Sequence, residues 1–104
     1  MTLNDILKNS SYDDVLFSEA EKAAVESAVV MKETRGVETP FIQCPIRGKE
    51  IKLTPEEVIR QLFLHRLIRE YHYPVSRIHV EEPVHFGREV KRADIVVLDK
   101  DNPT

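Results

Sequence analysis

The segment from Thr54 to Tyr71 constrains the fold more than any other part of the sequence. It opens with Thr54-Pro55-Glu56-Glu57, in which Thr54 suits the cap of a helix and Pro55 suits its first helical position. The apolar residues that follow are Val58, Ile59, Leu62, Phe63, Leu64, Leu67 and Ile68. They spread around most of the helix circumference, and such a helix has to be buried on more than one side. The sequence therefore predicts a helix over about 55–71 with other elements packed on several of its faces.

Shorter helices are predicted before this segment. Thr2 can cap a helix through Leu7, and Ser18 with Glu21 forms a capping-box pattern. Apolar residues from Ala24 to about Lys32 follow helical spacing, and Arg35-Gly36 is the predicted stop. We therefore expect residues 1–38 to be an N-terminal helical segment.

Strand patterns lie on both sides of the central helix. Residues 41–53 predict a short hairpin with an interrupted first strand and a turn at Arg47-Gly48-Lys49. Alternation and β-branched residues predict two further strands over about 77–86 and 91–98. The predicted fold is α+β or α/β: N-terminal helices, a short hairpin, and a core helix packed on a partial mixed β-sheet within residues 39–104.

Length and composition limit the class of protein. A chain of 104 residues, 41% of them hydrophobic, allows one small domain. Its longest clean apolar run is Ile95-Val96-Val97-Leu98, far short of a membrane span, and its N-terminus lacks a signal-peptide pattern. The single cysteine, Cys44, excludes an internal disulfide and suggests a reducing compartment. We therefore expect a cytoplasmic protein with no membrane partner.

The charge balance argues against a protein that simply coats nucleic acid. The net charge is −3, although residues 60–92 contain seven basic and four acidic residues. A nuclease is still compatible with this balance, because its metal site needs carboxylates. The charge pattern assigns no DNA-binding residue.

Asp94 and Glu57 are the candidate site residues. Asp94 lies in the run Arg92-Ala93-Asp94-Ile95-Val96-Val97-Leu98, where a buried carboxylate needs a cation, a metal or hydrogen-bond donors. A salt bridge to Arg92 or Lys91 would also satisfy it. Glu57 completes a capping box with Thr54, and on a helical projection it also falls on the apolar stripe that contains Leu64. Both explanations of Glu57 remain open at this point.

Histidine and cysteine chemistry is a weaker possibility. His79, Glu81 and His85 share one face of a predicted strand, but residues 79 and 85 would be about 20 Å apart, too far for one metal ion. Cys44 has no obvious base partner, so we expect it to be a small buried apolar residue.

The same residues carry a family resemblance. The helix start Leu53-Thr54-Pro55-Glu56-Glu57-Val58-Ile59-Arg60-Gln61 and the strand Lys91-Arg92-Ala93-Asp94-Ile95-Val96-Val97 are its two main motifs. Together with Pro45-Ile46-Arg47-Gly48-Lys49 and Tyr73-Pro74, they resemble the N-terminal nuclease domain of type I restriction enzyme R subunits. The resemblance covers roughly residues 41–98.

The resemblance implies a PD-(D/E)xK nuclease core that hydrolyses DNA phosphodiesters with Mg²⁺. Asp94 matches the family's metal-binding strand aspartate. Glu57, ahead of Glu56, best matches the helix glutamate that assists the site. The partners implied are double-stranded DNA and the modification and specificity subunits of the complex. The resemblance places ATP binding and translocation in other regions of a full-length subunit, and we expect no ATP to bind residues 1–104.

The chain departs from the family pattern after Asp94. The family's next strand carries a Glu-x-Lys, whereas Lys100 follows Asp99 and has Leu98 two positions before it. We therefore expect an N-terminal fragment with an incomplete restriction-endonuclease-like core, which does not cut DNA as given.

Two alternatives remain open. One is a non-catalytic DNA-binding or protein-interaction module with a degenerate nuclease fold. The other is a repair nuclease of the same superfamily, which would share Asp94 but lack the helix-start signature.

Overall fold

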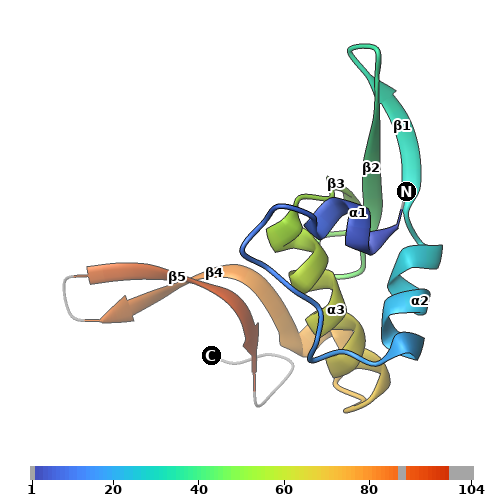
Figure 1. Ribbon diagram of the computed structural model, residues 1–104. Helices are drawn as coiled ribbons and strands as arrows, with labels where there is room; N and C mark the ends of the chain where they lie inside the picture. Colours follow the sequence, from blue (N-terminus) through green and yellow to red (C-terminus); the bar gives the residue numbers. More distant parts are fainter. Residues whose placement is uncertain (1, 87–88, 99–104) are drawn as a thin grey trace.

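The structure is a computed structural model that describes residues 2–86 and 89–98, and the side chains of residues 2–80 and 95–98. In chain order its elements are α1 (Leu3–Leu7), α2 (Glu19–Ser27), β1 (Val30–Thr34), β2 (Val37–Cys44), β3 (Lys49–Lys52), α3 (Pro55–Arg69), the short 3-10 helix η1 (Val75–Arg77), β4 (Ile78–Phe86) and β5 (Glu89–Val97). The fold class is α+β, as predicted. Figure 1 shows α3 near the centre, with the β1–β2 hairpin projecting upward above α2 and the β4–β5 hairpin extending to the left.

The two N-terminal helices begin at the predicted residues. The Thr2 hydroxyl accepts a hydrogen bond from the Asp5 backbone N–H, and the Asp5 carboxylate accepts one from the Thr2 backbone N–H. Ser18 and Glu21 make the same reciprocal pair at the start of α2. Each box satisfies two backbone N–H groups that the first helical turn leaves without partners.

Helix α2 ends earlier than the sequence pattern predicts. It stops at Ser27, and residues 30–38 belong to an antiparallel hairpin of β1 and β2, so residues 1–38 are not helical throughout. Arg35-Gly36 is the turn of this hairpin, with φ of 54° and 79°. Two successive left-handed residues match the twist of a two-residue hairpin turn, which explains why the pair joins two strands and does not cap a helix.

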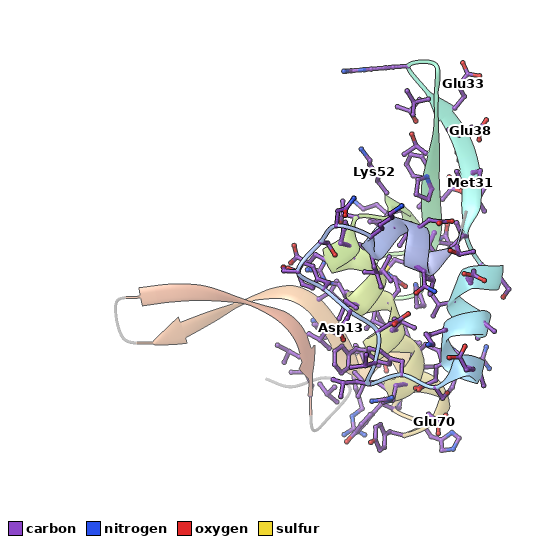
Figure 2. All side chains as sticks on the ribbon, viewed as in Figure 1. Asp13, Met31, Glu33, Glu38, Lys52 and Glu70 are labelled. Atoms are coloured by element: carbon purple, nitrogen blue, oxygen red, sulfur yellow. The ribbon has the colours of Figure 1, made fainter. Side chains whose placement is uncertain are left out.

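The hairpin of β1 and β2 extends beyond the helices. Figure 2 places Met31, Glu33 and Glu38 on it, away from α3. Only its inner end is covered: in β2, Thr39, Pro40, Ile42 and Cys44 are buried, while most of β1 is exposed.

Strand β3 completes a three-stranded antiparallel sheet in the order β1-β2-β3. Ile42 pairs with Ile51, and Gly48, at a φ of 67°, donates its N–H to the Cys44 carbonyl across the β2–β3 turn. The hairpin predicted over residues 41–53 is therefore confirmed. Pro40 lies inside β2, opposite Met31, and the strand continues unbroken from Val37 to Cys44, so the expected interruption of the first strand is not found.

Helix α3 is packed on two sides, as its sequence predicts. It contributes Val58 and Leu62 to an N-terminal core, whose buried residues are Leu3, Leu7, Phe17, Val25, Ile42, Leu53, Val58 and Leu62. A C-terminal core is formed by the buried Cys44, Leu64 and Ile78, with the partly buried Ile46, Ile51, Leu67, Ile68, Tyr73, Val80, Ile95 and Val97 around them. Each fully buried leucine contributes about 1.5–3 kcal/mol to folding, so α3 stabilises both cores.

Strands β4 and β5 form the second hairpin, close to the predicted bounds. Ile78 pairs with Val97 and Val80 with Ile95 at the end that packs against the C-terminal core. Every strand pair in residues 2–86 and 89–98 is antiparallel, so the expected mixed sheet is not found there. The three observed pairs are hairpins with short connections, whereas β3 and β4, which α3 connects, lie in separate sheets and do not pair.

Candidate functional site

Asp94 lies within β5. Its neighbours Ala93 and Ile95 are opposite Glu82 and Val80 of β4, which fixes the backbone position of residue 94 in the hairpin. The Asp94 side chain lies outside the described part of the structure. Its role as a metal ligand therefore stays a prediction.

Glu57 lies in the first turn of α3. Its backbone N–H donates to the Thr54 hydroxyl at 3.2 Å, so Thr54 caps the helix as predicted. Its carboxylate, however, is directed to other side chains and does not complete the predicted capping box. The residue is only 5% exposed, although a solvated glutamate would be usual at this position.

Three neighbouring side chains surround the Glu57 carboxylate. Oε1 accepts from Arg47 Nη1 at 3.3 Å, from Arg47 Nη2 at 3.2 Å and from Arg60 Nη1 at 2.7 Å. Oε2 accepts from Gln61 Nε2 at 2.9 Å. We refer to Arg47, Glu57, Arg60 and Gln61 as the Glu57 cluster.

The cluster is a buried charge arrangement. Arg60 and Gln61 are 7% and 4% exposed, and two guanidinium groups share one buried carboxylate. Arg60 also contacts Glu56 at 3.4 Å, but the Glu56 side chain is 53% exposed and its charge is screened by water. Because Arg47 comes from the β2–β3 turn, the cluster fastens that turn to the start of α3.

The sequence contained a signal for only part of this cluster. Arg60 and Gln61 follow Glu57 by three and four residues, the spacing at which helical side chains meet. Arg47 lies ten residues before Glu57 in a different element. No local pattern relates the two.

The described residues do not by themselves fit a Mg²⁺ site. Among them there is no group of three or more His, Cys, Asp or Glu side chains that could hold a metal ion. Glu57 supplies one carboxylate, and both of its oxygens already accept hydrogen bonds. Glu81 and His85 of the weaker histidine pattern lie outside the described side chains.

A second ion pair lies further along α3. Arg66 Nε and Nη2 donate to the two carboxylate oxygens of Glu21, each at 2.9 Å, and Nη2 also donates to the Leu16 carbonyl. The hydrogen bonds from Arg66, followed by that from the Ser18 backbone, lower the pKa of Glu21 from 4.5 to about 2. The guanidinium also lies 4.6 Å from the Phe17 ring centroid. This pair joins α2 and α3 and is structural.

Residues 55–104 match the family profile described as the type I restriction enzyme R protein N terminus. This part of the chain is similar to that family. The match includes α3, β4 and β5, and with them both Glu57 and Asp94. It begins after Arg47, so one member of the Glu57 cluster lies before the matched R protein segment.

No curated protein and no solved structure is significantly similar to the chain. Separately, no helix among the described residues is long and apolar enough to cross a membrane.

Proposed function

We propose that this chain is the N-terminal part of a type I restriction enzyme R subunit whose full-length form cleaves DNA. The family match of residues 55–104, which includes both Asp94 and Glu57, carries the proposal. Cleavage is metal-dependent phosphodiester hydrolysis coupled to ATP-driven translocation, and ATP binds regions other than residues 1–104. The partners are double-stranded DNA and the modification and specificity subunits, in the cytoplasm.

Asp94 is proposed as the metal ligand of this site. When bound, Mg²⁺ would activate a water molecule and offset charge on the scissile phosphate. Glu57 is proposed to assist from the first turn of α3. Its hydrogen bonds to Arg47, Arg60 and Gln61 fix the carboxylate in one orientation and hold the β2–β3 turn against the helix.

The decisive experiment uses the complete reading frame that encodes this chain. Its product, with Mg²⁺, ATP and the partner subunits, is expected to linearise a circular plasmid that carries the recognition site. Asp94→Ala should abolish cleavage while the circular dichroism spectrum stays unchanged. The matched control is Glu38→Ala, which removes an exposed acid on the β1–β2 hairpin and should leave cleavage intact.

Two results would refute the nuclease proposal. One is a reading frame without a hydrophobic strand carrying Glu-x-Lys within about 10–30 residues of Thr104. The other is normal cleavage by the Asp94→Ala protein.

A non-catalytic DNA-binding module is the second candidate. The state of Glu57 favours this candidate. Its carboxylate already pairs with two arginines, so it is not free to assist a metal site. This candidate predicts that neither Mg²⁺ nor Mn²⁺ changes the affinity for duplex DNA or the thermal stability. A metal-dependent change in either quantity, lost in Asp94→Ala, would exclude it.

A further inference from the structure

A groove of about 580 Å³ lies between α2, the end of β2 and α3, and this volume is within the usual range of small-molecule sites. Ala24, Ser27 and Ala28 line its α2 side at positions i, i+3 and i+4, so they share one side of the helix. Their short side chains leave space open toward α3.

The α3 side of the groove carries a row of polar side chains. Gln61, His65 and Arg69 follow one another at intervals of four residues, so they lie on one side of the helix over about 12 Å of its axis. Gln61 is 4% exposed, His65 is half-buried and Arg69 is exposed. The row therefore runs from a buried amide to a solvent-exposed guanidinium.

These polar side chains have unused hydrogen-bonding capacity. Gln61 Nε2 donates to Glu57 Oε2 at 2.9 Å, which orients the amide, but Gln61 Oε1 accepts no hydrogen bond from the described residues. The described side-chain atoms that have neither a partner nor contact with solvent do not include this oxygen, so it is accessible from the groove. His65 and Arg69 likewise make no hydrogen bond or ion pair within the described part of the chain.

The charge of the lining indicates the charge of the ligand. Arg69 is permanently positive, and none of the described lining residues is acidic, although the chain contains 18 Asp and Glu residues. A guanidinium can donate two parallel hydrogen bonds to the two oxygens of a carboxylate. One permanent charge matches a monoanion, and the apolar wall that includes Ile42 and Ile68 matches an apolar ligand body.

We propose that this groove binds an amphipathic organic carboxylate whose apolar body carries an N–H or O–H group. The carboxylate pairs with Arg69, and His65 is a second donor to it. The apolar body packs against Ile42 and Ile68, and its N–H or O–H donates to Gln61 Oε1. The site does not rest on the proposed function, because neither metal nor DNA takes part in it.

The first experiment varies the ligand, because Gln61 also holds Glu57 and its substitution would disturb the Glu57 cluster. Indole-3-propionate, which has a carboxylate, an apolar ring and an N–H group, is titrated into the 104-residue chain by calorimetry. It should bind saturably, and its uncharged primary amide should bind about 10-fold more weakly. Absence of saturation at millimolar concentrations, or equal affinities for the acid and the amide, would overturn the proposal.

The 1-methyl derivative of the same acid tests the buried end of the site. It lacks the N–H group, so Gln61 Oε1 is left without a donor and the affinity should fall about 3- to 10-fold. An unchanged affinity would refute the contact with Gln61.

The second experiment removes the charge from the groove. Arg69→Gln changes an exposed side chain, so the chain should fold normally, bind the acid about 10-fold more weakly and bind the amide as before. Arg35→Gln makes the same exchange at the β1–β2 turn, outside the groove, and should keep the preference for the acid. A preference that survives Arg69→Gln would contradict the placement of the carboxylate.

The third experiment locates the ligand. Ala24→Leu fills the groove and should abolish binding, whereas Ala20→Leu places the same side chain on an exposed position of α2 and should not. Methyl ¹H–¹³C spectra of the original chain give the location without any variant. The Ile42 and Ile68 signals should shift with the acid while those of Ile6 stay in place, and the reverse pattern would refute this site.

Discussion

Arg66 and Glu21 form a two-pronged ion pair across 45 residues of sequence, with both N–O distances at 2.9 Å. Glu21 also completes the capping box of α2, since its Oε1 accepts from the Ser18 backbone N–H at 2.8 Å. One carboxylate therefore fixes the start of α2 and its position against α3. Glu21 is only 4% exposed, so its carboxylate is shielded from water and salt, whereas the Arg66 side chain is 26% exposed.

We predict that this pair makes stability depend on acidic pH. The pKa of Glu21 is about 2 in the folded chain, against 4.5 as its ordinary value. A lowered pKa stabilises the fold fully above about pH 4.5, and the stabilisation is lost as the pH falls toward 2. Glu21→Gln should cost about 1.5–3 kcal/mol at neutral pH, the range for hydrogen bonds to charged groups.

Thermal unfolding followed by circular dichroism between pH 7 and pH 2 measures this effect. The melting temperatures of the original chain and Glu21→Gln should converge as the pH falls. A difference that stays constant over the whole range would contradict the assigned role. Glu19→Gln, on the exposed side of the same helical turn, is the control.

We predict that Glu57→Gln destabilises the fold much more than Glu56→Gln. The first substitution leaves two guanidiniums without the carboxylate that they share, and breaking a buried pair costs about 3–5 kcal/mol. The second affects an exposed pair and should change stability by less than about 1 kcal/mol. Urea unfolding at neutral pH gives both values, and equal midpoints for the two variants would show that the cluster contributes little.

We predict that Gly36 is required by the β1–β2 turn for its backbone conformation alone. Its φ is 79°, and an added Cβ would meet no atom within 4 Å. Gly36→Ala should therefore cost about 1–2 kcal/mol through backbone strain, and Gly36→Asn should cost less because asparagine tolerates left-handed φ. Urea unfolding compares the two variants, and an alanine variant as stable as the original chain would refute the strain argument.

Features set by neighbouring residues were predictable from the sequence. Thr2, Ser18 and Thr54 cap the three α-helices because each cap bonds to a backbone N–H three residues later. The length of α3 and its burial on two sides also follow from its own apolar pattern.

Features set by distant residues were not predictable in this way. The helical spacing that begins at Ala24 was expected to continue to about Lys32, but pairing of residues 30–34 with residues 37–41 makes them a strand. The sequence left the Glu57 carboxylate open between the helix cap and the candidate site, and it could not show the pairing with Arg47, because Arg47 comes from a separate element. In both cases a partner outside the local window decides the structure.

The central position of α3 also bears on how the chain unfolds. Its two sheets share no strand pair in the described residues, and the N-terminal and C-terminal cores both include side chains of α3. Each hairpin can therefore open without breaking the hydrogen bonds of the other, whereas loss of α3 removes support from both. Amide protons of α3 should consequently be the slowest to exchange with solvent, and those in the outer parts of the two hairpins should exchange through local openings.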